Sequence, residues 1–247
     1  MNRTVATAHD TLSALLEGAK RSALPVRASF VQTLGPRGKA SAGPLSLFVR
    51  SHHERALDQY LLFHAVASGD DFGVARPARV WARALSFGDG PSAIGSVSKN
   101  WSWLESHSLV ERHRYGRLSK PYLLREDGSG KTYVHPSKAG ERYFKVTHEF
   151  WLDDWHRRLG LAAKAVLLIA LSLSDDFILP VEHASKWYGL SPDTLNRGLL
   201  SLRKSGVLRV RRERRVAPLA PEGYTWEHRY TLDSPFGPRG RPQKVGT

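Results

Sequence analysis

Apolar residues recur at helical spacing near the C-terminal end of the chain. Leu195, Leu199 and Leu202 lie four and three residues apart, which predicts one apolar stripe along a helix. Ser191 supplies an N-cap hydroxyl, and Pro192 suits the first helical position. The sequence therefore predicts a well-delimited helix that starts at residue 192 and ends before the glycine at 206.

Beyond this helix the period of the pattern changes to two, which predicts a β-hairpin. Leu208 and Val210 alternate with Arg209 and Arg211, so the first strand has one apolar and one basic face. A second alternation predicts the return strand, and it consists of Tyr224, Trp226, His228, Tyr230 and Leu232.

The first half of the chain shows the same succession. Ser51-His52-His53-Glu54 matches a capping box and is expected to open a helix. A second helix is expected around residues 77–85, and a third after Gly90-Pro91. Leu109 and Val110 start a strand, which leads into a basic hairpin tip and returns through residues 122–124.

Landmarks in the two halves match at nearly constant offsets, which indicates an internal repeat. Trp81 corresponds to Trp187 at an offset of 106, and Asp70-Asp71-Phe72 corresponds to Asp175-Asp176-Phe177. The third helices and the hairpins match at an offset of 98, so the first copy has eight extra residues before its third helix. Many small helical domains share leucine spacing, but that spacing does not predict matching tryptophan and Asp-Asp-Phe landmarks.

These patterns divide the chain into four parts. Residues 1–50 form an N-terminal extension, with one helix and then an extended or loop segment over 25–50, and it is expected to pack on the first domain. Residues 51–146 form the first domain and residues 147–233 the second. Residues 234–247 are basic and have no apolar pattern, which predicts a tail without a core.

A helix, a sharp turn, a second helix and a basic hairpin resemble the winged helix-turn-helix family, over roughly residues 51–233. The resemblance implies an α+β, mainly helical fold with two winged helix domains in tandem. In that family the second helix of the motif enters the major groove of DNA, and the wing touches the backbone or the minor groove. Tandem modules of this length and charge resemble replication initiators of plasmids and other mobile elements, and transcription regulators use the same modules. The resemblance therefore implies sequence-specific binding of double-stranded DNA in one of these two roles.

The composition favours a polyanionic partner. The chain of 247 residues carries a formal net charge of +14 and has a pI of about 10.3, and such a field attracts polyanions. Nucleic acid is the first candidate, ahead of an anionic membrane surface. The sequence has no cysteine, which excludes disulfides and thiolate metal sites. The strongest apolar run, residues 165–171, is too short to cross a bilayer, so we expect a cytoplasmic, nucleoid-associated protein without a membrane partner.

The third helix of each copy supplies candidate DNA-reading side chains. Arg197 suits bidentate contact with guanine, and Asn196 suits the same contact with adenine. The candidates on the second copy are Ser191, Thr194, Asn196, Arg197 and Ser201, and those on the first copy are Ser96, Lys99 and Asn100. Formation of a homodimer is the alternative role for the helix of the first copy.

The two hairpins and the tail supply candidates for contact with phosphates or the minor groove. The hairpin candidates are Arg209, Arg211, Arg212, Arg214 and Arg215 in the second copy, and Arg112, Arg114, Arg117 and Lys120 in the first. The stretch Pro238-Arg239-Gly240-Arg241-Pro242 resembles the core of an AT-hook. In that family both arginines, here Arg239 and Arg241, lie along the minor groove of A/T-rich DNA.

The sequence motifs that could indicate an enzyme are incomplete. Gly130-Lys131-Thr132 lacks the earlier glycine of a phosphate-binding loop, because residue 125 is Arg125. His148-Glu149 lacks the second histidine of a metalloprotease helix, and the repeated Asp-Asp pairs favour a turn over two-metal chemistry. We therefore expect no enzyme, no metal and no cofactor. An architectural DNA-coating or protein-bridging protein is the alternative function, and an enzyme acting on DNA is a third.

Overall fold

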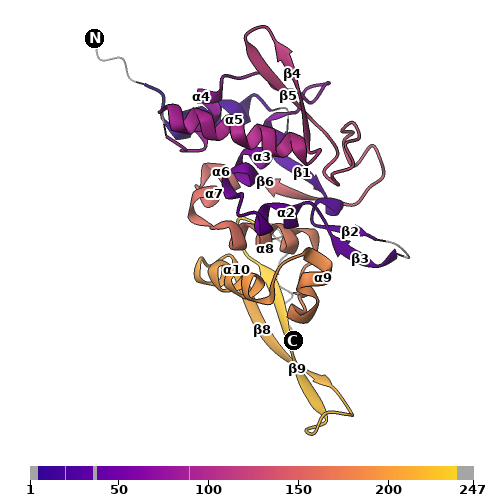
Figure 1. Ribbon diagram of the computed structural model, residues 1–247. Coiled ribbons are helices and arrows are strands. Elements are labelled where there is room, and N and C mark those ends of the chain that lie inside the picture. Colours follow the sequence, from indigo (N-terminus) through magenta and orange to yellow (C-terminus); the bar gives the residue numbers. More distant parts are fainter. Residues whose placement is uncertain (1–4, 20, 36–37, 89, 238–247) are drawn as a thin grey trace.

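The computed structural model describes residues 5–19, 21–35, 38–88 and 90–237, and it is an α+β structure with small antiparallel sheets (Figure 1). Its α-helices are α1 (Ala8–Glu17), α2 (Leu45–Arg50), α3 (Glu54–Val66), α4 (Ala78–Ala84), α5 (Pro91–Ser106), α6 (Glu149–Leu152), α7 (Trp155–Arg158), α8 (Leu161–Ser172), α9 (Ala184–Tyr188) and α10 (Pro192–Lys204). Its strands are β1 (Ala23–Arg27), β2 (Gln32–Leu34), β3 (Ala40–Ala42), β4 (Val110–Tyr115), β5 (Leu118–Leu123), β6 (Tyr143–Thr147), β7 (Phe177–Ile178), β8 (Leu208–Val216) and β9 (Tyr224–Leu232). Short 3₁₀ helices in the described part of the chain are η1 (Ala28–Phe30) and η3 (Val181–His183).

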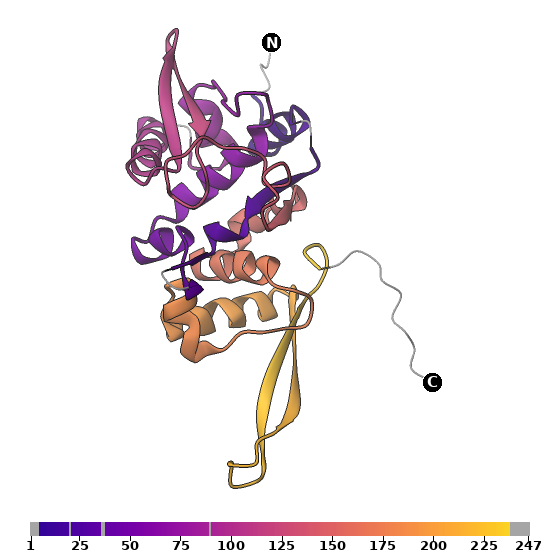
Figure 2. The same ribbon diagram turned by 90° about the vertical axis from the view of Figure 1, so that its right-hand side faces the viewer.

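Two segments have the same order of three helices and a hairpin, which confirms the order of elements expected from the repeat. The first consists of α3, α4, α5 and the hairpin β4–β5, and the second of α8, α9, α10 and the hairpin β8–β9. In the second segment β7 pairs with β9 and completes a three-stranded sheet, whereas the first has an isolated bridge between Gly73 and Tyr122. The two hairpins extend from opposite ends of the molecule (Figure 1 and Figure 2).

Helix α8 lies at the centre of the second segment and is buried along most of its length. Helix α10 packs on one side of it, and β6 and α2 contact it as well. The helices approach closely at Gly198, because a Cβ at that position would lie 2.4 Å from Val166 Cγ2 and 2.5 Å from the carbonyl oxygen of Ala162. Only glycine therefore fits this crossing without movement of a neighbour.

The N-terminal extension contains more regular structure than the sequence indicates. Its segment 25–50, expected as an extended or loop segment, includes a strand that pairs with β6, the β2–β3 hairpin and helix α2. The extension also contacts the second segment as well as the first, since β3 packs against α9. A Cβ on Gly189, at the turn between α9 and α10, would lie 2.6 Å from the Cβ of Ser46.

A buried ion-pair network fastens this extension to the segment after β5. The guanidinium of Arg27 is 1% exposed and pairs with the fully buried carboxylate of Glu126. Arg27 Nε also lies 2.5 Å from Glu141 Oε2, and Arg125 holds the other oxygen of Glu141. Because an unpaired buried charge is costly, these contacts strongly specify how the extension docks.

Two expectations about helix starts and the tail are wrong. Helix α3 begins only at Glu54, with His53 as its N-cap and no side-chain capping bond, so the predicted capping box at Ser51 does not form. A capping box forms instead at Thr7, where the side chains and backbones of Thr7 and Asp10 exchange hydrogen bonds. In the tail, Phe236 is only 7% exposed, because its ring packs against Phe150 and Trp155. The packed part of the chain therefore extends beyond residue 234.

One buried charge cluster joins the two repeated segments. Lys164 of α8 is 1% exposed, and its Nζ lies 2.7 Å from Asp58 Oδ1 and 2.8 Å from Glu54 Oε1 of α3. Asp58 and Lys164 are 106 residues apart, the same offset that separates Trp81 from Trp187, so equivalent positions of the two copies meet. Burial raises the pKa of Asp58 to about 7, although the Lys164 ammonium opposes this shift.

Candidate nucleic-acid interface

Helix α10 begins as its sequence predicts. The Ser191 side chain accepts a hydrogen bond from the Thr194 backbone N–H, and Pro192 occupies the first turn. Gly189 takes a φ of +66°, which an L side chain rarely adopts, and so allows the sharp turn out of α9. The leucine stripe of α10 is buried, which leaves its opposite face to solvent.

That exposed face is polar and basic. Asn196 and Arg197 are exposed as predicted, whereas Thr194 and Ser201 are half-buried. Arg197 Nε lies 3.0 Å from Asp193 Oδ2, but both side chains are mostly exposed, so the pair is weak and easily exchanged. The same exposed face continues at helical spacing through Arg203 and Lys204, which are not among the candidates predicted from the sequence.

The register of the hairpin β8–β9 gives it two different faces. Side chains of paired residues point to the same side of a sheet and alternate along each strand. The inner face, which packs on the helices at its base, carries Leu208, Val210, Arg212, Arg214 and Val216 of β8 and Tyr224, Trp226, His228, Tyr230 and Leu232 of β9. The outer face carries Arg209, Arg211, Glu213 and Arg215 of β8 and Thr225, Glu227, Arg229 and Thr231 of β9.

Arginines on the outer face are paired with carboxylates. Arg209 Nε lies 2.7 Å from Asp233 Oδ2, and Arg215 Nη1 lies 3.4 Å from Glu227 Oε1. Arg211 Nη2 lies 2.7 Å from Asp176 Oδ2, and this hydrogen bond lowers the pKa of the Asp176 carboxyl. Three of the five arginines of this hairpin that were predicted to contact phosphates are thus paired with carboxylates of the protein itself.

Arginines on the inner face are stacked on aromatic rings instead. The guanidinium carbon of Arg212 lies 4.4 Å from the ring centroid of Trp226. That of Arg214 lies 4.6 Å from the ring of Tyr224 and 5.3 Å from the ring of Trp226. Among the described residues, neither arginine contacts a carboxylate, so both retain an uncompensated positive charge.

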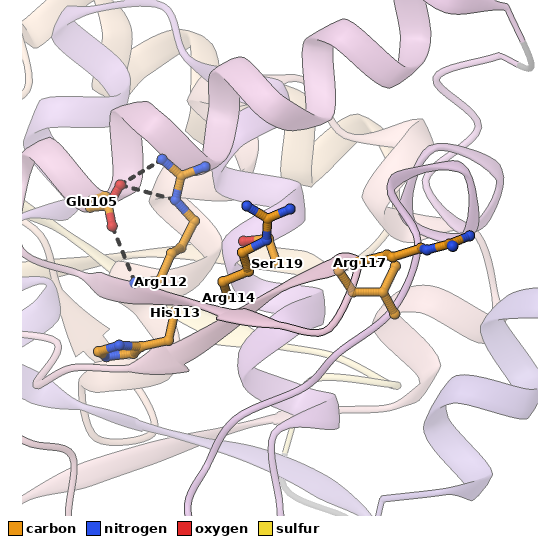
Figure 3. Close-up of a pocket in the computed structure, with 7 residues that line it drawn as sticks. Glu105, Arg112, His113, Arg114, Arg117 and Ser119 are labelled. Atoms are coloured by element: carbon orange, nitrogen blue, oxygen red, sulfur yellow. Dashed lines mark hydrogen bonds and ion pairs between the residues drawn. The ribbon is translucent and has the colours of Figure 1, made fainter.

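The hairpin β4–β5 of the first segment borders an open hollow of about 400 Å³. Figure 3 shows Arg112 turned toward Glu105, Arg114 beside Ser119, and Arg117 pointing away from both. Arg112 donates hydrogen bonds to both carboxylate oxygens of Glu105, one from its backbone N–H and others from its guanidinium.

Of the other three cations of this hairpin, one is paired with a carboxylate and two are not. Lys120 pairs with Asp71, the equivalent of Asp176 in the second copy. Arg114 and Arg117 are exposed, and none of the described carboxylates contacts them. Asp71 and Asp176 thus occupy equivalent positions of the two copies, and each pairs with a cation of its own hairpin. No group of three or more histidine, aspartate or glutamate side chains in the described ranges could hold a metal ion.

Helix α5 differs from α10 at its predicted DNA-reading positions. Asn100, expected at the surface, is 7% exposed because its Nδ2 donates to Gln59 Oε1 of α3 at 2.9 Å. Ser96 is half-buried and donates its hydroxyl to the Ser92 carbonyl of the preceding turn. Lys99 is the remaining exposed candidate on this helix.

Arg239 and Arg241 lie outside the described residues. Over the parts of the chain that the structure describes, no helix has the length and apolar character needed to cross a bilayer. Comparison with protein-family models, with curated proteins and with solved structures finds no match for this chain.

Proposed function

We propose that this chain binds double-stranded DNA sequence-specifically through its second repeated segment, with α10 in the major groove. The observation that carries the proposal is the combination of two adjoining surfaces with exposed positive charge. These are the polar face of α10, with Asn196 and Arg197, and the inner face of the hairpin, with Arg212 and Arg214. Both repeated segments are proposed to be winged helix domains, in keeping with their order of helices and hairpin.

Each group has a role that follows from its chemistry. Arg197 presents a planar fork of donors suited to guanine, and Asn196 presents the donor and acceptor pair that matches adenine. Arg203 and Lys204 sit in the last turn of α10 and supply charge for the phosphates. Helix α5 lacks such a set, because Asn100 is buried. We therefore propose that the second segment reads bases and that the first supports binding through its exposed Arg114 and Arg117.

A protein of this kind acts in replication initiation of a mobile element or in transcription regulation, and the proposal covers both. Neither role requires a catalytic set or a cofactor in this chain. Both require affinity for one duplex sequence well above the affinity for random duplex.

The test is selection followed by titration. Duplexes retained by the purified full chain from a random pool are sequenced, and binding of the enriched duplex and of a random duplex is measured by fluorescence anisotropy at several salt concentrations. We expect log affinity to fall linearly with log salt, each neutralised phosphate contributing about 0.9 to the slope. A slope near zero would contradict nucleic-acid binding. Equal affinity for both duplexes would instead support an architectural protein with little sequence preference.

A further inference from the structure

The hairpin β8–β9 contains two kinds of arginine on its two faces. On the outer face, four arginines face four carboxylates, which come from Asp176, Glu213, Glu227 and Asp233. On the inner face, Arg212 and Arg214 have only aromatic partners among the described residues. A polyanion that approaches the outer face meets compensated charge, whereas one that approaches the inner face meets net positive charge.

Stacking also restricts where the inner arginines can point. Arg214 lies within reach of both rings, and Arg212 lies over Trp226. A guanidinium that lies over an aromatic ring can still donate through its N–H groups, while its side chain loses rotamer freedom before any ligand binds. Such preorganisation lowers the entropy cost of binding an anion.

We infer that the hairpin binds DNA phosphates through its inner face alone, with Trp226 and Tyr224 as positioning residues that hold Arg212 and Arg214 in place. This inference rests on the proposed DNA-binding function and assigns the contact to two of the five arginines in the run 209–215. The outer-face arginines have a different role. They form ion pairs that join β8 to β9, and through Asp176 they join both strands to the residue that precedes β7.

The alternative occupant of this face is an unpaired base stacked on Trp226, whose side chain is 43% exposed. Base stacking on aromatic side chains is the usual means of binding single strands. Two guanidinium groups already lie against this indole ring, which favours contact with phosphates over contact with bases.

The test compares two double variants that remove the same charge from opposite faces. Arg212→Gln/Arg214→Gln alters the inner face, and Arg209→Gln/Arg215→Gln alters the outer face. On the selected duplex we expect the inner variant to lower the salt slope by about 1.8, that is, two phosphates at about 0.9 each. The outer variant is expected to keep the slope of the unaltered chain and to lose some thermal stability, because Asp233 loses Arg209 and Glu227 keeps only its contact with Arg229.

Further variants separate the charge of the arginines from their position. Arg212→Lys/Arg214→Lys keeps the charge. We expect this variant to keep most of the salt slope of duplex binding while it binds the selected duplex several-fold more weakly. Trp226→Leu is expected to weaken duplex binding several-fold, and Trp226→Phe to restore most of the loss, since a ring is again present. Circular dichroism of each variant checks that the chain remains folded.

The outcomes separate failure of the inference from failure of the proposed function. If the unaltered chain shows no salt-dependent binding, the proposed function itself fails. If it binds with a steep slope but the inner and outer variants lose the same slope, the inference is overturned and the function stands. A Trp226→Leu variant that loses binding to single-stranded oligothymidine but not to duplex would also overturn the inference, in favour of base stacking.

Discussion

The two repeated segments share an order of elements but differ in charge at equivalent positions. Glu105 of α5 neutralises Arg112 of the neighbouring strand. At the offset of 98 residues, the same two positions hold Arg203, which is exposed, and Val210. An acid–base pair in one copy thus corresponds to a free cation in the other. The comparison shows that one fold supports two surfaces of different electrostatic character, so function has to be argued from the side chains of each copy.

The same contrast occurs where the third helix packs on the first. In the second segment Gly198 lets α10 approach α8 closely, whereas the equivalent residue of the first segment is Asn100, which bonds to Gln59 of α3. A polar side chain that serves as an internal hydrogen-bond partner is removed from the surface. At this position α5 therefore has a buried polar contact with α3, where α10 has a close approach to α8.

The largest effect is expected at the contact between the two copies. Lys164→Met removes the ammonium that pairs with the buried Asp58 and with Glu54, so we expect the free energy of unfolding to fall by about 3–5 kcal/mol at pH 8, where Asp58 of the unaltered chain is mostly ionised. Urea unfolding followed by circular dichroism measures this. Lys186→Met, at an exposed lysine of α9, is the control and should change stability by less than about 0.5 kcal/mol. Equal effects of the two variants would refute the view that the cluster joins the halves.

A smaller effect is expected from two glycines in the third helices. Gly198→Ala places a Cβ against Val166 and Ala162 and should destabilise the chain by about 1–3 kcal/mol. Gly95→Ala in α5 meets open space, and it should stabilise by about 0.5–1 kcal/mol through helix propensity. Thermal unfolding of both variants distinguishes them, and the same sign for both changes would contradict the described difference in helix packing.

The charge cluster also predicts a pH dependence. Burial raises the pKa of Asp58 in the folded chain to about 7 from 3.8, so its contribution to stability is greatest below about pH 4 and is lost as the pH rises toward 7. Asp58→Asn removes this titration. Because His156, whose pKa burial lowers to about 4, is present in both chains, the difference between them isolates Asp58. We expect the stability of the unaltered chain relative to the variant to decrease between pH 4 and pH 7, and a constant difference would exclude titration of Asp58 in that window.

A still smaller effect is expected at the first hairpin. Glu105→Gln should free Arg112 for a phosphate and raise the salt slope of duplex binding by at most about 0.9. Glu111→Gln makes the same change of charge at an exposed position of β4 and serves as the control. A similar increase with both variants would indicate only a change in net charge.

Local signals allowed much of this fold to be predicted from the sequence. The start of α10 follows from Ser191 and Pro192, and the hairpin β8–β9 follows from the alternation at the start of β8 and along β9. These features depend on residues close together in the chain. The capping box predicted at Ser51 shows the limit of short motifs. The sequence pattern is present there but its hydrogen bonds do not form, whereas they do form at Thr7, where aspartate takes the place of the usual glutamate.

Features that depend on distant partners could not be predicted. Asn100 has the spacing of a surface residue, and its burial depends on Gln59, which lies 41 residues earlier. The arginine run 209–215 shows no sign in the sequence that Asp176 and Asp233 neutralise part of it. Only the structure therefore shows which arginines of the candidate site are paired with carboxylates and which are not.

The most direct test of the central claim compares Arg197→Ala with Lys99→Ala, which alter equivalent exposed positions of α10 and α5. The affinity of each variant is measured for the selected duplex and for a panel with every base pair substituted in turn. We expect Arg197→Ala to abolish discrimination at one or two base pairs, a loss of about 1–3 kcal/mol, and Lys99→Ala to weaken all duplexes alike with the panel profile unchanged. An unchanged profile for Arg197→Ala, or a base-specific loss for Lys99→Ala, would contradict the assignment of base reading to the second segment.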